Sequence, residues 1–293
     1  MTAIVLYYLS FPVRGYRWKL LLRNAKIDEG SKDKHLPVLK YGEFIFLSWF
    51  VNSITWFRLG DAYRAYAFSD KTKVSFAKTI GTVAAERVID IAVVFVLLLV
   101  SGIGLLRSTD NKTVGVVVVS ALALAVTFGL LLLLMRLVGL KVARFLPKRV
   151  QELYTTFHEG TLGSFRQLPM VALLSVVIWL LEAGRLFFVT RALGFEIGLA
   201  MVLFASLAHS LLTTIPFTPG GLGFVELGLT GLLALAVPKG DAASITLLDR
   251  SISYLSIVVF GGLLFAFRQI TEARKQSHDK APVSDSPSET RSP

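Results

Sequence analysis

Ionisable residues within apolar stretches are the side chains of this sequence best suited to chemistry. Glu86, Arg87 and Asp90 begin one apolar run, and Glu182 and Arg185 stand three apart in the middle of another. A charged group at membrane depth is costly unless it is paired or faces water, so it marks a functional site by default. Residues three or four apart share one face of a helix, so these groups can pair with one another.

A second polar feature is the string PFTPGGLGFVE at residues 216–226, which interrupts an apolar stretch and ends in a lone carboxylate, Glu226. Irregular backbone inside a bilayer is tolerated only where it is buried in protein or lines a watery cavity. The string therefore predicts a polar cavity within the membrane. Asp249 and Arg250 open the last apolar segment, one turn before Tyr254.

Each of these groups also has a plainer structural interpretation. Glu86 and Arg87 could be interfacial charges at a helix entry, and Glu182 and Arg185 could form a purely structural ion pair. His209 is interpreted first as a polar helix-packing residue and second as a proton carrier. The sequence has no His-x-x-x-His, paired Asp-rich or P-loop motif and no cysteine, so it predicts no catalytic residue, metal ligand or cofactor.

The composition of the chain indicates which secondary-structure elements position these ionisable groups. Hydrophobic residues make up 54% of the chain, charged residues 17%, and the mean hydropathy is +0.63. A bilayer core about 30 Å thick needs roughly 20 apolar helical residues. We expect an all-α polytopic integral membrane helical bundle with re-entrant or broken helices and about six or seven membrane segments. Full spans are predicted at 88–106, 113–135, 169–190 and 251–267, an interrupted pair at 197–225 and 227–238, a short segment at 43–57 and a half-span at 1–13.

The net charge of the chain is +11, and its lysine and arginine residues are unevenly distributed along the sequence. This distribution predicts the orientation of the protein in the membrane. Most of these residues lie in four segments (14–40, 58–80, 136–168 and from Arg268 onward), whereas the segments 107–112, 191–198 and 238–249 together hold four. The positive-inside rule places the basic segments in the cytoplasm. Residues 43–57 must then enter and leave on the cytoplasmic side as a re-entrant or interfacial hairpin. Apart from setting the orientation, these basic residues are expected to contact anionic lipid headgroups rather than nucleic acid.

A weak internal symmetry accompanies this pattern. A short or broken apolar segment precedes a helix that opens with an acid–arginine pair twice, at Glu86–Arg87 and at Asp249–Arg250. Inverted repeats of this kind build a shared site near the middle of the membrane from their interrupted segments. The two interrupted segments are therefore expected to face each other.

Several strings together resemble one known family. RGYRWKLLL (14–22), RLGDAYRAY (58–66), AAERVIDIAV (84–93), the stretch 157–194, PFTPGGLGFVE and DRSISY (249–254) are similar to the lysylphosphatidylglycerol synthase transmembrane region, also called the flippase-like UPF0104 family. The resemblance runs from about residue 5 to 268 and implies a multi-span protein of the bacterial or archaeal plasma membrane. In aminoacyl-phosphatidylglycerol synthases this region moves the modified lipid between leaflets.

This sequence departs from the family pattern in three respects. No aminoacyltransferase domain follows residue 268, so we expect a flippase-like transmembrane domain at 1–268 and a disordered cytoplasmic tail at 269–293, without enzymatic activity. Trp56 and Phe57 stand where the family tends to carry a proline, and Asp61 replaces a glutamate. Members also carry about one and a half more spans before RWKLLL, so we expect Met1 to be an internal methionine.

The sequence hypothesis is that this protein moves a phospholipid or lipid-linked headgroup between leaflets. The partners expected are membrane phospholipids, anionic or aminoacylated, and a separate lipid-modifying synthase or glycosyltransferase; no nucleic acid is expected. A membrane-embedded glycosyltransferase-type enzyme and an accessory subunit remain as alternatives. The residues expected along the headgroup path are Arg58, Arg64, Glu86, Arg87, Asp90, Glu182, Arg185, Pro219, Gly220, Gly221, Glu226, Asp249 and Arg250.

Overall fold

All secondary structure in the described part of the chain is helical. The computed structural model describes residues 1–27, 36–106, 112–145, 147–214 and 218–279. Its α-helices are α1 (Thr2–Asn24), α2 (Val38–Ile54), α3 (Leu59–Thr72), α4 (Phe76–Leu106), α5 (Lys112–Leu134), α6 (Leu140–Ala143), α7 (Lys148–Gly163), α8 (Leu168–Ala192), α9 (Leu199–Thr214), α10 (Phe224–Leu233), α11 (Lys239–Arg250) and α12 (Ser256–Asp279). Short π- or 3₁₀-helical segments are η2 (Met135–Gly139), η3 (Ser164–Gln167), η4 (Pro219–Gly221) and η5 (Ser251–Leu255). The predicted all-α class is confirmed.

Within the described residues, four helical stretches are long and apolar enough to cross a membrane. They run over Phe76–Leu105, Ala125–Ala143, Lys148–Ala192 and Lys239–Thr271. Each overlaps one of the four predicted full spans. The prediction of a multi-pass helical membrane protein therefore holds, and the π-helical segments η2 and η5 lie inside two of these stretches.

Four shorter helices lie at or beside the predicted interruptions; α3 falls within residues 58–80, which were predicted as a basic connection and not as part of the short segment at 43–57. α2 has 17 residues and α3 has 14, while α9 has 16 and α10 has 10. At 1.5 Å per residue these helices are about 15 to 26 Å long, less than the roughly 30 Å of a bilayer core. We call α2–α3 the first hairpin and α9–α10 the second hairpin. Residues 215–217, at the start of the predicted break, lie outside the described residues.

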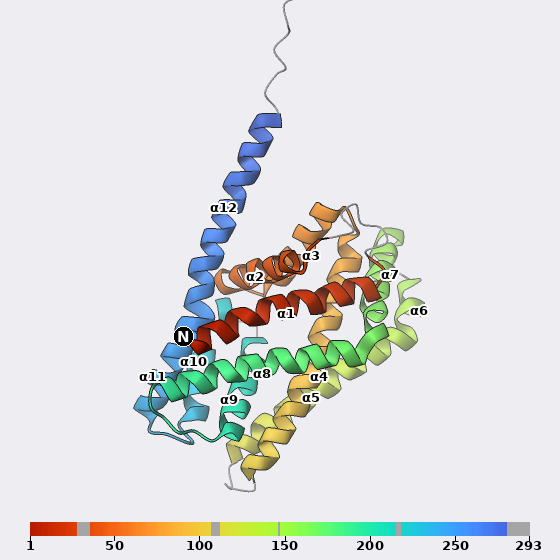
Figure 1. Ribbon diagram of the computed structural model, residues 1–293. Coiled ribbons are helices and arrows are strands. Elements are labelled where there is room, and N and C mark those ends of the chain that lie inside the picture. The colour runs from red at the N-terminus through yellow and green to blue at the C-terminus, as the bar shows by residue number, and fades with distance from the viewer. Residues whose placement is uncertain (28–35, 107–111, 146, 215–217, 280–293) are drawn as a thin grey trace, which may run out of the picture.

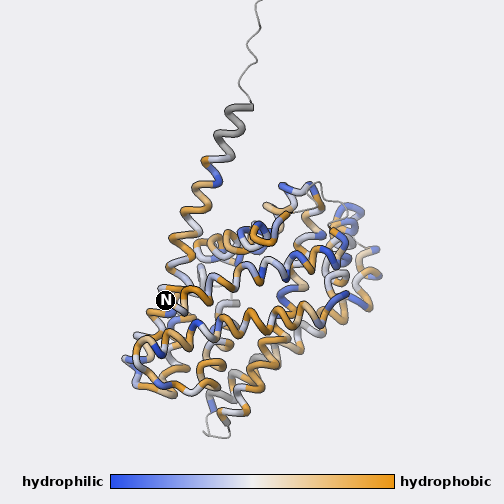
Figure 2. The backbone as a smooth tube through the Cα atoms, in the orientation of Figure 1, coloured by the Kyte–Doolittle hydropathy of each residue, from blue (hydrophilic) through white to orange (hydrophobic). Residues whose placement is uncertain are grey.

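The long helices surround these hairpins (Figure 1). α1 and α8 lie side by side along their lengths, and α4 packs against α5, α7 and α9. α12 packs against α2 and then projects beyond the rest of the bundle. Figure 2 shows long hydrophobic stretches on α5 and α8, with hydrophilic residues gathered at the end of the bundle where α3 and α7 lie.

The two ends of the chain differ in detail from the sequence expectations. The apolar residues 1–13 are the first part of one continuous 23-residue helix, α1, which carries Arg14 and Arg17 inward. The predicted half-span is therefore the apolar first part of a longer helix, which is not among the four stretches that are apolar enough to span. At the other end, α12 continues to Asp279, so the predicted tail from residue 269 begins as helix; residues 280–293 lie outside the described residues.

Close packing of α1 on the first hairpin fixes one wall of the interior. The two helix backbones meet at Gly15 and Gly42: a Cβ added to Gly15 would lie 2.5 Å from the backbone nitrogen of Gly42. Around this crossing, Trp18 packs edge-on against Phe68 with ring centroids 5.2 Å apart. Backbones that approach this closely leave no room for a methyl group, because packed interiors lack compensating space.

We therefore predict that Gly15→Ala lowers stability by about 1–3 kcal/mol, the usual cost of overpacking a tight interior. The measurement is thermal unfolding of the detergent-solubilised protein. Gly231→Ala in α10 is the matched control, because nothing lies within 4 Å of a Cβ built there. An unchanged midpoint for Gly15→Ala would contradict the backbone contact.

Candidate functional site

A cavity of about 550 Å³ lies between the two hairpins and the long helices. Its wall is apolar over much of its area, including Val88, Ile91 and Leu131, but it also carries an unusual number of charges. The charged residues that line it are Arg14, Arg58, Asp61, Arg87, Asp90, Glu182, Arg185 and Arg250. Charged groups in a membrane bundle characteristically face such a cavity or pair with one another.

The tips of the two hairpins meet at this cavity. The Tyr254 hydroxyl donates a hydrogen bond to the Ser53 carbonyl at 3.1 Å, and Arg58 Nη1 donates to the Thr213 carbonyl at 2.7 Å. Ser53 lies near the end of α2, and its Cα would be 3.4 Å from a Cβ on Gly220. The interrupted segments therefore face each other, as the internal symmetry of the sequence suggested.

The turn that follows α9 in the second hairpin is stabilised by hydrogen bonds between its own backbone groups. Gly220 and Gly221 have positive φ angles of 58° and 75°, which glycine adopts readily. The Gly221 N–H donates to Thr218 O and the Leu222 N–H donates to Pro219 O, both at 3.1 Å. Arg250 Nη2 donates to the Gly220 carbonyl at 3.0 Å. In this arrangement the turn offers a carbonyl to Arg250, while the N–H groups of Gly221 and Leu222 form hydrogen bonds within the turn itself.

Each hairpin carries a carboxylate at the third position of its second helix, held by an arginine from the next long helical stretch. Asp61 accepts two hydrogen bonds from Arg87, 2.7 Å from Nη2 and 3.1 Å from Nε. Glu226 accepts one from Arg250 Nε at 2.6 Å and caps its own helix by accepting the Gly223 N–H at 2.6 Å. Burial alone would raise the pKa of Asp61, but Arg87 and Arg58 outweigh it and hold that pKa below its ordinary value.

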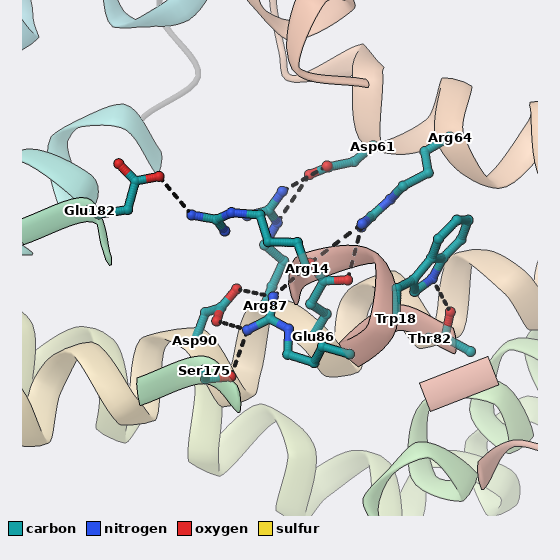
Figure 3. Close-up of polar contacts among 11 residues, drawn as sticks. Arg14, Trp18, Asp61, Arg64, Thr82, Glu86, Arg87, Asp90, Ser175 and Glu182 are labelled. Atoms are coloured by element: carbon teal, nitrogen blue, oxygen red, sulfur yellow. Dashed lines mark hydrogen bonds and ion pairs between the residues drawn. The ribbon is translucent and has the colours of Figure 1, made fainter. Parts of the chain in front are cut away.

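Behind the cavity wall, Arg17 organises the deepest ion pairs; Figure 3 labels its partners Glu86, Asp90 and Ser175. Its side chain is fully buried and binds Glu86 at 2.9 Å, both oxygens of Asp90, and the Ser175 hydroxyl at 2.6 Å. Arg64 completes this group by binding Glu86 at 3.1 Å. Glu86 is 4% exposed, so it is not an interfacial charge. Three helices, α1, α3 and α4, are thereby tied together by charge.

A parallel set joins α1, α8 and α11. Glu182 accepts hydrogen bonds from Arg14 at 2.9 Å and lies 3.2 Å from Arg185. Arg185 in turn lies 2.9 Å from Asp249. The intramembrane pair expected between Glu182 and Arg185 is therefore present, and it extends to partners on two other helices.

The structure brings the sequence-predicted residues together around one cavity. Eight of them line it: Arg58, Arg87, Asp90, Glu182, Arg185, Gly220, Gly221 and Arg250. The others stand outside that lining: Arg64, Glu86, Pro219, Glu226 and Asp249. Four of these five are ion-paired, directly to a lining arginine or, through Glu86, to Arg17. His209, interpreted as a packing residue, lies on α9 and lines the cavity.

Comparison with known proteins identifies the family of this chain. The family described as the lysylphosphatidylglycerol synthase TM region matches residues 1–261. The chain belongs to this family. A UPF0104 membrane protein of Methanocaldococcus jannaschii is 33% identical over 74% of this chain and 93% of its own length.

Two further relatives extend the comparison. A UPF0104 membrane protein of Pyrococcus horikoshii is 25% identical over 90% of this chain and 85% of its own length. Glycosyltransferase AglD of Haloferax volcanii is 24% identical over 95% of this chain and 52% of its own length. The chain therefore resembles about half of that glycosyltransferase.

Sequence reasoning missed four residues that the structure places in or beside the cavity: Arg14, Arg17, Trp49 and Trp179. Arg14 and Arg17 were counted with the basic loop at 14–40, yet both are buried. The Arg14 guanidinium lies between two cavity tryptophans, 4.7 Å from the ring of Trp49 and 5.5 Å from that of Trp179. The available signal was their spacing of three on an apolar helix, the same spacing as Glu182 and Arg185.

We predict that Arg17→Gln destabilises the protein by about 3–5 kcal/mol, because it leaves buried Asp90 without its arginine and Glu86 with Arg64 alone. Thermal unfolding in detergent measures this. Arg191→Gln is the control: its pair with Glu196 is exposed and should be worth less than about 1 kcal/mol. Equal midpoints for the two variants would argue against a buried structural role for Arg17.

Proposed function

We propose that this protein moves the polar headgroup of a phospholipid or lipid-linked compound between the two leaflets of the plasma membrane. Moving a headgroup requires a polar path through the bilayer while the acyl chains stay in lipid. The observation that carries this proposal is the charged cavity of about 550 Å³ at the junction of two hairpins too short to span. Interrupted helices around a central site are the usual construction of membrane transporters.

The mixed lining of the cavity supports the same function. Arginines can bind a phosphate through planar, two-pronged hydrogen bonding, and five of them line the cavity. Apolar residues such as Val88 and Leu131 share that wall, so a headgroup and the first part of its chains can both find matching surface. The substrate would be a membrane phospholipid, and a separate synthase or glycosyltransferase would supply modified lipids.

The proposal includes orientation. The segment at 136–168, the open end of the first hairpin with Lys71 and Lys73, and the C-terminal tail would lie in the cytoplasm by the positive-inside rule. The first hairpin would then enter from the cytoplasmic side and the second from the outside. Such opposed hairpins would let the cavity open alternately to the two leaflets.

A second candidate is a membrane-embedded transferase acting on a lipid-linked sugar, which the similarity to glycosyltransferase AglD favours. Against it, all three carboxylates that line the cavity are bound by arginine: Asp61, Asp90 and Glu182. A carboxylate that accepts hydrogen bonds from a guanidinium is a poor general base. Sugar transfer from a lipid-linked donor by the purified protein would favour this candidate over transport. An accessory subunit, the remaining alternative, would tolerate loss of the cavity charges.

We predict that the protein reconstituted in liposomes accelerates leaflet exchange of a fluorescent phospholipid, and that Glu226→Gln and Arg250→Gln each slow it by about tenfold or more. The expected size is that of one lost charge-assisted hydrogen bond. The physical reason is that the Glu226–Arg250 pair holds Gly220 and the tip of the second hairpin.

Glu196→Gln is the matched control, because the Glu196 side chain is 85% exposed and pairs only with exposed Arg191 among the described contacts. It should exchange lipid at the wild-type rate. Exchange no faster than in protein-free vesicles, or equal rates in all variants, would contradict the transport proposal.

A further inference from the structure

Among the residues that the structure describes, the charges around the cavity balance everywhere except at one point. Arg64 and Arg17 face Glu86 and Asp90; Arg14 and Arg185 face Glu182 and Asp249; Arg250 faces Glu226. In each of these groups carboxylates equal arginines. The remaining group joins two arginines, Arg58 and Arg87, to the single carboxylate of Asp61. One net positive charge therefore remains at the tip of the first hairpin.

That excess charge is also the most accessible one. The side chains of Arg58 and Arg87 are 25% and 27% exposed, and both line the cavity. The other five arginines of these groups are exposed by 9% or less. A ligand in the cavity can therefore reach these two guanidinium groups, which share one counterion, more readily than the other lining arginines, which are 9% exposed or less.

The backbone at this tip is held in an uncommon form. Phe57 and Arg58 are consecutive non-glycine residues in the left-handed region, with φ angles of 58° and 54°. Such conformations persist only where the surrounding structure enforces them, and they gather at ligand-binding sites. Here the Arg58 side chain is tethered across the cavity by its 2.7 Å hydrogen bond to the Thr213 carbonyl. The tether presents the guanidinium at the junction of the two hairpins.

The second hairpin lacks this feature. Its carboxylate, Glu226, holds the same helix position as Asp61, but the residue in the place of Arg58 is Gly223. Glu226 therefore has one arginine, Arg250, where Asp61 has two. The excess charge belongs to the first hairpin alone.

We propose that Arg58 and Arg87 form a binding site for a phosphate group with one negative charge. This deepens the proposed function, on which it rests, by naming the headgroup chemistry. A phosphodiester monoanion matches the single excess charge, and its oxygens fit the planar donors of arginine. A headgroup with net positive charge would instead meet like charge. The phosphate would be carried by a lipid, because apolar residues continue the wall beside these arginines.

Binding can be measured without transport, because Trp49 and Trp179 line the same cavity. The detergent-solubilised full chain would be titrated with short-chain phosphatidylglycerol, short-chain lysylphosphatidylglycerol and inorganic phosphate while tryptophan fluorescence is followed. We expect saturable binding of phosphatidylglycerol that is at least about tenfold tighter than that of the cationic lipid. Binding of inorganic phosphate at the same concentrations would identify the source as free phosphate; no such binding identifies the lipid headgroup.

Two substitutions should act in opposite directions. Arg58→Gln removes the excess charge and should weaken phosphatidylglycerol binding about tenfold or more, whereas Asp61→Asn raises the excess and should strengthen it. A folding defect cannot produce opposite shifts. Arg191→Gln, whose side chain is 44% exposed and lies outside the cavity lining, should bind as the wild type does.

The site is overturned if both substitutions weaken binding, if neither changes it, or if the cationic lipid binds as tightly as phosphatidylglycerol. These outcomes are separate from the fate of the transport proposal. Binding that depends on Arg58, in a protein that does not exchange lipid in vesicles, keeps the phosphate site and removes transport. Exchange of cationic lipid that is indifferent to Arg58 keeps transport and removes the site.

Discussion

The cost of burying charge in a membrane-spanning bundle is the constraint on which this structure depends. Each buried arginine must find a carboxylate because few waters are available to it, and most of the partners come from other helices. Arg17 on α1 is met by Glu86 and Asp90 on α4 and by Ser175 on α8. The ion pairs therefore fix the relative positions of helices that apolar contacts alone would leave free to slide.

The same constraint gives the two halves of the molecule matching parts. In each half a hairpin ends at the cavity, its second helix offers a carboxylate in the first turn, and an arginine from the next long helical stretch binds it. The acid that precedes that arginine binds an arginine from a helix earlier in the chain: Glu86 binds Arg17, and Asp249 binds Arg185. This correspondence explains why the acid–arginine strings occur twice in the sequence. The two halves differ at one corresponding position, where the first hairpin has Arg58 and the second has Gly223. This difference places the excess positive charge in the first hairpin.

Much of the fold could be predicted because length and hydropathy determine it directly. The four long apolar helices, the two interruptions and the i, i+3 pair of Glu182 and Arg185 follow from local spacing. The glycines and prolines of residues 216–226 also identified an irregular element correctly. The predictions failed for arginine, which occurs both in exposed basic loops and in buried ion pairs. Arg14 and Arg17 look like loop charges by composition, yet each finds carboxylates on helices far along the chain.

The sequence by itself determined that this is a helical membrane protein with two broken elements and a set of charges that must be buried or paired. Its periodicity and composition carry that information because the bilayer excludes other solutions. Only the tertiary structure decided which arginine meets which carboxylate. Pairs such as Arg14 with Glu182 and Arg58 with Thr213 join residues more than 150 positions apart. Their choice depends on how whole helices pack, so the location of the unbalanced charge was fixed only when all the pairs were formed.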